Sequence, residues 1–308
     1  MNQIVKWKSQ RRFGIEFEFR NSSSSLEVLQ RTVQSAGFQC RRINYEHTRN
    51  NGSEWCAKTD SSCGTELASG ILKGWRELKL AAELLPKLEE AGFYYQDNCG
   101  MHVHVELADY NSEQAKVLGM IWLKIERFVM NGTPASRQDN TYCRTIERRA
   151  IREEPNRHYS PDWVWNNVLG NRDAINFGNY RPGTDGYGSR GTVEFRFGEM
   201  TFDPEVIKNR VRFLIWLVEI CKILPAPDNL NWYGPKQILK MFGLLQRPQS
   251  PIKLHFSPAV QSMRKWVLER LIAFSAPTFE RDIELCQRML EEINNEQQLL
   301  AGTEGEEL

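Results

Sequence analysis

Two acidic or basic residues spaced two positions apart lie in each of three short segments of the chain, residues 14–19, 99–105 and 192–197. Alternation of ionisable with β-branched or aromatic residues is the period of a β-strand. Side chains two positions apart on a strand point to the same face, about 6.6–6.8 Å apart along the backbone. If the three strands belong to one sheet, one of its faces is apolar and the other carries acids and bases. The predicted polar face consists of Glu16, Glu18, His102, His104, Glu194 and Arg196.

The glutamates of this face predict a divalent cation. At an effective dielectric constant of about 20 and a separation of ~6.7 Å, Glu16 and Glu18 repel each other by roughly 2–3 kcal/mol. Glu66 and Glu194 on the same sheet would add to this repulsion. Buried carboxylates would respond by taking up protons, whereas a divalent cation between them removes the repulsion. Oxygen ligands with one imidazole favour Mg²⁺ or Mn²⁺ over Zn²⁺. The alternative interpretation is the solvated face of an antiparallel sheet.

A zinc site is the second metal hypothesis. Cys99-x-x-His102-x-His104 would supply three ligands, with Cys143 or Cys63 as a remote fourth ligand. The spacing matches no common zinc-finger or zinc-ribbon pattern, so zinc is the weaker hypothesis. Two of the five histidines of the chain lie on this one predicted strand face, which favours a role for at least one of them.

Arg196 shares the predicted face with Glu194 and has two interpretations. It forms either an ion pair worth under ~1 kcal/mol if exposed, or a clamp for a phosphate or carboxylate, whose oxygens match the guanidinium fork. Arg181, Arg190 and the arginines between residues 144 and 152 would add phosphate contacts. The chain has no Walker-type or Gly-x-Gly-x-x-Gly loop, so a nucleotide would be held by metal ions and arginines.

Hydrophobic periodicity predicts the elements that position these residues. Strands are expected at residues 12–20, 38–43, 101–107 and 192–197, with a hairpin at 55–58 and 65–69 around 60–64. Helices are expected at residues 26–36, 75–91, 111–130, 204–224, 234–245, 258–274 and 277–300. Residues 131–191 lack periodicity and are expected to form a long loop that is functional or disordered. Pro225 divides the chain into a catalytic domain, residues 1–225, and a helical C-terminal extension, residues 226–308, packed on the same domain.

Composition and charge narrow the class of protein. The chain has 308 residues, of which 41% are hydrophobic and 26% charged, as in a globular protein with a full core. A net charge of +1 gives no bulk attraction to nucleic acid or to anionic membranes. No secretory signal and no apolar run of ~18 residues is visible. Seven cysteines at irregular spacing indicate reduced thiols. We therefore expect a cytoplasmic protein with no membrane partner and no bulk nucleic-acid partner. The sequence does not predict the oligomeric state.

Five motifs follow one another between residues 13 and 221. They are Gly14-x-Glu16-x-Glu18, Trp55-Cys-Ala-Lys58-Thr-Asp60-Ser-Ser, Gly64-Thr-Glu66-Leu-Ala-Ser69 with Gly74, Cys99-Gly-Met-His102-Val-His104, and Gly191-Thr-Val-Glu194-Phe-Arg196. In this order they resemble the putative amidoligase family, within the glutamine-synthetase-like superfamily of carboxylate–amine ligases. The Gly-Met-His-Val-His and Glu-x-Arg motifs are also similar to those of glutamine synthetase itself.

The resemblance implies an α+β fold, with a glutamine-synthetase-like curved antiparallel sheet, helices on its convex face and, in this chain, additional C-terminal helices. It implies that the concave face holds ATP and two or three divalent ions, Mg²⁺ or Mn²⁺. The implied function is an ATP-dependent carboxylate–amine ligase. ATP would phosphorylate a substrate carboxylate, and an amine would displace phosphate from the acyl phosphate to form an amide. The substrates would be small-molecule or peptide carboxylates and amines.

The resemblance also implies metal ligands. Glu18 and Glu66 are similar to ligands of the metal nearest the substrate carboxylate. Glu16, His102 and Glu194 are similar to ligands of the metal that bridges the ATP phosphates. His104 is the alternative ligand, or it orients substrate.

Three other roles carry over from the family. Arg196 would stabilise the transferring phosphoryl group, with Arg190 as a second catalytic candidate. Arg181 would join these two arginines in binding the nucleotide. Asp60 would bind or deprotonate the amine, although family members commonly have Asp-Gly-Ser where this chain has Asp60-Ser61-Ser62.

Two other functions stay open. A kinase on the same architecture would phosphorylate a carboxylate or guanidinium and stop there. A non-catalytic metal- or nucleotide-binding protein would retain the site without turnover. The sequence identifies neither the acid nor the amine.

Overall fold

The structure is a computed structural model that describes residues 11–21, 26–43, 52–131, 141, 143–147, 150, 160–167, 169, 173–180, 191–225, 234–241, 258–274 and 280–303. The chain divides into two compact units. One consists of Lys8–Leu230, and the other of Met1–Trp7 with Asn231–Leu308. Two sequence predictions, Arg181 and Arg190, lie outside the described residues.

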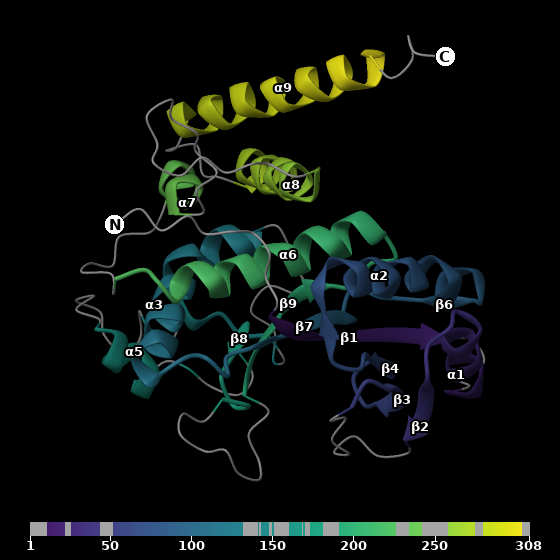
Figure 1. The fold of residues 1–308 in the computed structure, drawn as a ribbon. Coiled ribbons are helices and arrows are strands. Elements are labelled where there is room, and N and C mark those ends of the chain that lie inside the picture. Colours follow the sequence, from purple (N-terminus) through teal and green to yellow (C-terminus); the bar gives the residue numbers. More distant parts are fainter. Residues whose placement is uncertain are drawn as a thin grey trace. The chain divides into compact units, whose positions relative to one another are not determined.

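A nine-stranded sheet, counted over the described residues, is the centre of the unit Lys8–Leu230 (Figure 1). The strand order is β2-β3-β4-β1-β7-β9-β8, and β5 and β6 also pair with β1. Pairing is antiparallel except between β2 and β3, so the sheet is mixed rather than wholly antiparallel as predicted. The strands are β1 (Arg12–Asn21), β2 (Cys40–Ile43), β3 (Trp55–Asp60), β4 (Gly64–Ala68), β5 (Leu72–Lys73), β6 (Phe93–Tyr94), β7 (Gly100–Glu106), β8 (Ile175–Asn176) and β9 (Thr192–Glu199).

Three long helices lie on the same side of this sheet (Figure 1). They are α2 (Gly74–Glu90), α3 (Ser112–Asn131) and α6 (Pro204–Cys221). Helix α6 packs against α2, α3 and β7. Its start is fixed by Asp203, whose carboxylate accepts the backbone N–H of Glu205 at 2.8 Å, and by proline at the first helical position. On the flank of the sheet, α1 (Leu26–Ser35) packs on β2 and β3.

The hydrophobic core lies between the helices and the predicted apolar face of the sheet. Phe17, Phe19 and Phe195 have no solvent-exposed surface. The ring of Trp122 on α3 lies 5.3 Å from the ring of Phe195 and 5.5 Å from that of Phe197, measured between centroids. Ile15, Val103, Val105 and Val193 are buried as well. The structure therefore confirms the apolar half of the alternating pattern.

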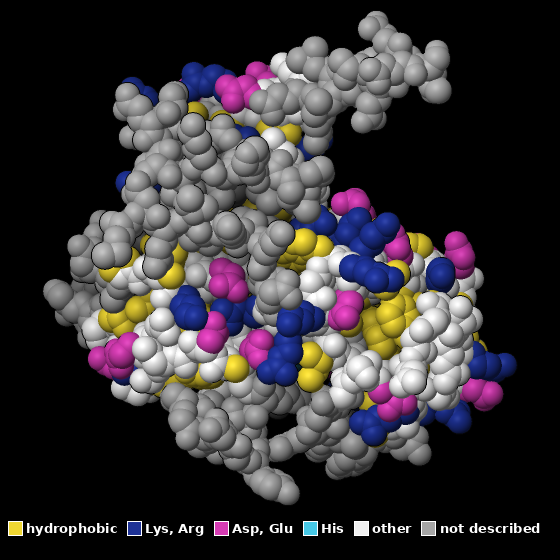
Figure 2. Space-filling view, in the orientation of Figure 1, with side chains coloured by type: hydrophobic (Ala, Val, Ile, Leu, Met, Phe, Trp, Pro, Cys, Tyr) yellow, Lys and Arg dark blue, Asp and Glu magenta, His cyan; other side chains and the backbone are white. Residues whose placement is uncertain are grey.

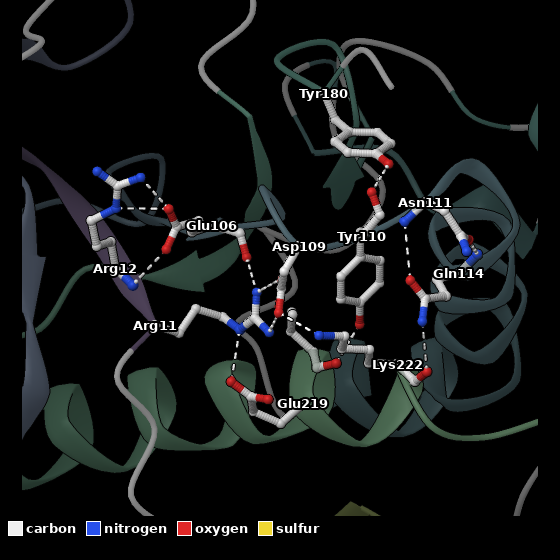
Figure 3. A network of polar contacts seen from close by, with 11 residues as sticks. Arg11, Arg12, Glu106, Asp109, Tyr110, Asn111, Gln114, Tyr180, Glu219 and Lys222 are labelled. Atoms are coloured by element: carbon white, nitrogen blue, oxygen red, sulfur yellow. Dashed lines mark hydrogen bonds and ion pairs between the residues drawn. The ribbon is translucent and has the colours of Figure 1, made fainter. Parts of the chain in front are cut away.

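A network of polar contacts holds the start of β1 to the loop after β7 and to the end of α6 (Figure 3). The buried guanidinium of Arg11 donates to Glu219 Oε1 at 2.8 Å and to Asp109 Oδ1 at 2.7 Å. Tyr180 donates its hydroxyl to the carbonyl of Tyr110 at 2.9 Å. This hydrogen bond connects the segment that follows β8 to the same network.

The α+β fold class predicted from the sequence is confirmed, and each predicted strand and helix has a counterpart among the described residues. Residues 131–191 were expected to be a loop, but the described part of this stretch contains helix α5 (Pro161–Asn167), packed on α3, and strand β8. Both elements are too short to show a period in the sequence.

The second unit contains α7 (Pro235–Met241), α8 (Pro258–Phe274) and α9 (Glu280–Thr303). Helix α9 packs against both α7 and α8, and the N–H of Lys236 donates to Asp282 Oδ2 at 3.2 Å. Over the described residues, no helix has the length and apolarity needed to cross a membrane. On the face drawn in Figure 2, the described lysines and arginines are interspersed with aspartates and glutamates, in keeping with the net charge of +1.

Candidate active site

Strand register brings the predicted polar residues into rows across one face of the sheet. In the first row, Lys58 on β3 lies opposite Glu66 on β4, and Glu66 lies opposite Glu18 on β1. In the second row, Glu16 on β1 lies opposite His102 on β7. The three strands β4, β1 and β7 thus place three carboxylates and an imidazole next to one another.

A third row completes the face. His104 on β7 lies opposite Glu194 on β9, and Glu194 lies opposite Asn176 on β8. The pairing of β7 with β9 shifts register between Met101 and Val103. Over this interval one residue of β7, His102, lies opposite two residues of β9, Arg196 and Phe197, so the extra residue of the bulge belongs to β9. The pairing of β7 with β1 is regular through the same positions, so the strand period places His102 and His104 on one face.

This polar face is buried. The exposed fraction is 6% for Glu18, 7% for Glu66, 4% for His102, 8% for His104 and 4% for Glu194. Surface glutamates of an antiparallel sheet would be largely exposed, so the alternative of a solvated face is wrong for these residues. Buried acids need hydrogen bonds, counter-charges or metal ions.

Glu16, His104 and Glu194 form the most compact group of metal-ligating atoms among the described residues. One carboxylate oxygen of each glutamate and one ring nitrogen of His104 all lie within 4.8 Å of one another. His104 Nε2 is 3.3 Å from Glu16 Oε1. Two carboxylates and an imidazole are donors that Mg²⁺ and Mn²⁺ accept, and this spacing fits a single ion. No cysteine belongs to this group, which weighs against the zinc hypothesis.

His102 lies between the carboxylates rather than beside one of them. Its Nδ1 is 3.4 Å from Glu16 Oε2 and 3.7 Å from Glu194 Oε1, and its Nε2 is 3.5 Å from Glu18 Oε1. The sequence favoured His102 over His104 as the metal ligand. The geometry places His104 in the compact group and His102 at the centre of the face, within reach of three glutamates.

Electrostatics distinguish Glu16 from Glu66. Burial alone would raise the pKa of Glu16, but His104 and His102 outweigh burial and hold this pKa well below its usual range. For Glu66, burial raises the pKa well above its usual range, the charge of Glu16 adds to the increase, and Lys58 opposes it. The two carboxylates thus differ strongly in pKa although they lie on one face, and perturbed pKa values of this kind are common at functional sites.

Glu18 is fixed by the backbone of the neighbouring strand. Its Oε2 accepts the N–H of Gly100 at 2.5 Å and lies 3.6 Å from Cys63 Sγ, which acts as a weak donor. Glu66 has a different partner, because Lys58 Nζ lies 2.7 Å from Glu66 Oε1. Glu18 and Glu66, the two predicted ligands of one metal ion, therefore lie opposite each other on neighbouring strands but have different hydrogen-bonding and ionic partners.

Arg196 and Asn176 orient the carboxylate of Glu194 from two directions. Arg196 donates to Glu194 Oε1 through Nη1, and Asn176 donates to Glu194 Oε2 through Nδ2 at 2.8 Å. Burial would raise the pKa of Glu194, but His104 and Arg196 lower it below its usual value. The side-chain oxygen of Asn176 accepts the N–H of Gly178 at 2.8 Å, so the amide cannot rotate without breaking a turn.

Asp60 lies in the turn between β3 and β4. Its Oδ1 accepts the backbone N–H of Ser62 at 2.8 Å and that of Cys63 at 2.7 Å. These bonds are an Asx turn, which stabilises the hairpin. The structure thus gives Asp60 a local structural role, and its proposed contact with an amine stays a prediction.

Comparison with known proteins identifies the family. A family described as "putative amidoligase enzyme" matches residues 9–218. Among solved structures, the crystal structure of the complex between the prokaryotic ubiquitin-like protein Pup and its ligase PafA matches with a TM-score of 0.36 and 15% sequence identity, over 93% of this chain and 64% of that chain. This chain therefore spans less than two thirds of the matched chain. No curated protein matches.

The fold and the site together define an α+β protein with a buried carboxylate–imidazole face. The family match covers the whole sheet and every described residue of that face. The chain belongs to the putative amidoligase family, and this membership supports a carboxylate–amine ligase as its class.

Proposed function

We propose that this chain is an ATP-dependent carboxylate–amine ligase that acts through an acyl-phosphate intermediate. One observation carries the proposal: Glu16, Glu18, Glu66 and Glu194 are gathered on one sheet face with two imidazoles and Arg196, in a member of the putative amidoligase family. Phosphoryl transfer depends mainly on positioning and on charge neutralisation, for which acids that hold metal ions and an arginine suffice.

The residues present fit a divalent cation, because buried carboxylate oxygens and an imidazole nitrogen converge within 4.8 Å. Glu16, His104 and Glu194 would hold it, and the family resemblance adds His102. Glu18 and Glu66 would serve a second ion nearer the substrate carboxylate. A bound Mg²⁺ or Mn²⁺ supplies charge neutralisation for the triphosphate. The total of two or three ions with ATP stays a prediction.

Arg196 is the proposed electrophilic residue. Its guanidinium is held by Glu194 on the polar face, and nearby carboxylates raise its pKa further although burial lowers it, so it stays cationic throughout. A fixed cation aimed at the transferring phosphoryl group stabilises the charge that develops there. Arg181 and Arg190 are proposed to assist with the nucleotide.

The proposed reaction has two balanced steps. A carboxylate oxygen of the first substrate attacks the γ-phosphorus of ATP, and the bond to ADP breaks. The nitrogen of the amine then attacks the acyl carbon, phosphate leaves with the bonding electron pair, and the nitrogen loses a proton. Asp60 is the proposed acceptor of that proton or the anchor of the amine. The low exposure of this face would limit the access of water to the acyl phosphate, which water would otherwise hydrolyse.

The proposal is tested with ATP, Mg²⁺ and panels of amino acids, peptides and amines. We expect release of ADP and phosphate in equal amounts with an amide product of the corresponding mass. Hydroxylamine in place of the amine should trap the acyl phosphate as a hydroxamate. Glu194→Gln should abolish both signals, whereas Glu89→Gln on the exposed surface of α2 should retain them.

Other outcomes separate the alternatives. A stable phosphorylated product without an amide identifies a kinase. Metal binding with no turnover, unchanged by Glu16→Gln and Glu194→Gln, identifies a non-catalytic binding protein. Cleavage of ATP without a ligated product across broad panels contradicts the ligase proposal.

A further inference from the structure

Cys63 and Cys99 are two buried thiols that lie together beside Glu18. Cys63 is the last residue of the turn between β3 and β4, and Cys99 immediately precedes β7. Cys63 Sγ lies 3.4 Å from the carbonyl oxygen of Asn98, the residue before Cys99. It also lies 3.6 Å from Glu18 Oε2, which accepts the N–H of Gly100, the residue after Cys99. The side chains of the two cysteines are hydrogen-bonded to each other.

Contacts between the two backbone segments hold this pair of thiols in place. Asn98 donates its side-chain amide to the carbonyl oxygen of Ser62 at 2.9 Å, which links the segment before β7 to the turn between β3 and β4. Within that turn, Asp60 Oδ1 accepts the backbone N–H of Cys63 at 2.7 Å. The two thiols are therefore positioned by hydrogen bonds on both sides, at the end of the polar face that contains Glu18.

Cys99 has the properties of an attacking thiol. The hydrogen bond from Cys63 outweighs burial and lowers the pKa of Cys99 to about 7. Burial instead raises the pKa of Cys40 and that of Cys286 to about 12. A thiol whose pKa is near the ambient pH attacks most effectively, because much of it is thiolate and the thiolate is still strongly nucleophilic. A second thiol, that of Cys63, lies next to it.

We propose that Cys63 and Cys99 are a modification site at which a small peroxide forms a reversible disulfide. The sulfur of Cys99 attacks one peroxide oxygen, the O–O bond breaks, and the released hydroxide takes up a proton to give water. The sulfur of Cys63 then attacks the sulfur of the resulting sulfenic acid, and the S–O bond breaks. The second hydroxide leaves with the proton of Cys63 as water. Two thiols thus lose two electrons, and one hydrogen peroxide is reduced to two waters.

Burial selects the oxidant. The exposed fraction is 0% for Cys63 and 1% for Cys99, whereas residues 96–98 next to them are exposed. Opening of an exposed segment requires little free energy, and it admits a small peroxide more readily than a disulfide as large as oxidised glutathione. The disulfide has no S–H to donate to Glu18, so oxidation changes the surroundings of a proposed metal ligand. The formation of the disulfide does not depend on the proposed function.

The proposal is tested by treating the full chain with hydrogen peroxide, alkylating it in denaturant and analysing its peptides by mass spectrometry. We expect one peptide pair, joined through Cys63 and Cys99, that dithiothreitol separates again. In Cys63→Ser, dimedone should trap Cys99 as a sulfenic acid, because the second thiol is missing. Cys40→Ser, the same change at a buried thiol with a raised pKa, should retain the disulfide. Oxidised glutathione in place of peroxide should form the disulfide at least about tenfold more slowly.

Each outcome decides the question. If Cys63 and Cys99 are alkylated separately after peroxide treatment, the proposal is wrong. Oxidation of Cys99 to a sulfinic acid while Cys63 stays a thiol would also overturn it, as would a disulfide to any other cysteine. If circular dichroism shows that Cys63→Ser does not fold, Cys63→Ala gives the same comparison. A chain that forms this disulfide but no amide would contradict the proposed function alone.

Discussion

Asn176→Asp should destabilise the protein in a way that grows with pH. The side chain keeps its shape, and its Oδ1 still accepts the N–H of Gly178. The amide donor that faces Glu194 Oε2 at 2.8 Å is replaced by a carboxylate oxygen. Both positions are buried, with exposed fractions of 7% and 4%, so water cannot take the place of the lost donor.

The loss in free energy of unfolding is set by whichever of two responses to the introduced carboxylate requires less free energy. If both carboxylates stay ionised at a charge separation of about 4 Å, their repulsion is about 4 kcal/mol at an effective dielectric constant of about 20, and the lost charge-assisted hydrogen bond adds about 1.5–3 kcal/mol. If the introduced aspartate instead takes up a proton, it can donate to Glu194 again. At pH 7 this protonation costs about 4 kcal/mol, because pH 7 lies about 3 units above the ordinary pKa of an aspartate and each unit corresponds to about 1.4 kcal/mol. The deficit at pH 7 is therefore at most about 4 kcal/mol.

The sign of the pH dependence is fixed by linkage. The introduced aspartate has a raised pKa in the folded state, so the unfolded state releases its proton first as pH rises. The free energy of unfolding of Asn176→Asp should fall relative to the unmodified chain by about 1.4 kcal/mol per pH unit above pH ~4. Urea unfolding followed by circular dichroism between pH 5 and pH 8, without divalent ions, measures this difference.

Asn166→Asp is the matched control, because it makes the same change on the exposed surface of α5. It should stay within about 0.5 kcal/mol of the unmodified chain at every pH. A deficit for Asn176→Asp under about 1 kcal/mol at pH 8, or one that does not change with pH, would show that Asn176 does not face an ionised Glu194.

Three further predictions concern the scaffold. Burial raises the pKa of Glu126 to about 8 from 4.5, so the free energy of unfolding should fall between pH 5 and pH 8, and Glu126→Gln should flatten this dependence in urea titrations. Gly198→Ala would place a Cβ 2.7 Å from the carbonyl oxygen of Met101, and should cost about 1–3 kcal/mol in the same assay. Arg11→Met would remove a buried guanidinium that donates to Glu219 and to Asp109, whose exposed carboxylate keeps its contact with Lys222, and should cost about 1–3 kcal/mol.

Each of these predictions has a control on the surface. Glu89→Gln should not change the pH dependence, and an unchanged slope in Glu126→Gln would contradict the raised pKa. Gly52→Ala places a Cβ 3.9 Å from the backbone nitrogen of Glu54, an ordinary van der Waals contact, so it should be near neutral. Arg31→Met breaks only an exposed helical ion pair with Glu27 and should cost under about 0.5 kcal/mol. An Arg11→Met variant as stable as Arg31→Met would mean that the contacts of Arg11 drawn in Figure 3 do not stabilise the protein.

The sequence was sufficient for the two faces of the sheet because β1, β7 and β9 are long enough to show the period of a strand. Glu16 and Glu18 on one side and Phe17 and Phe19 on the other follow from that period alone. The contact of Lys58 with Glu66 was also accessible in principle. A hairpin in which Asp60 pairs with Gly64 requires, by counting outward two residues on each strand, that Lys58 pairs with Glu66.

Other features depend on contacts that no local pattern encodes. Strand β8 has two residues and thus no period, so Asn176 reaches Glu194 only through pairing with β9. The register shift between β7 and β9 places both Arg196 and Phe197 opposite His102, which a strict alternation cannot predict. The proposed roles of Arg181 and Arg190 lie outside the described residues and stay predictions.

Strand β1 has pairing partners along both of its edges, with β4 and β5 on one side and β7 on the other. The ten residues of β1 therefore contribute to both faces of the sheet: the even-numbered Glu16 and Glu18 to the candidate site, and the odd-numbered phenylalanines to the core. Replacing one residue of β1 alters one contact. Inserting or deleting one residue between Ile15 and Phe19 would exchange the two surfaces downstream of the change, driving a carboxylate among phenylalanines and a phenylalanine among acids. In descendants of this gene, the length of that segment should thus be less free to vary than the identity of any residue within it.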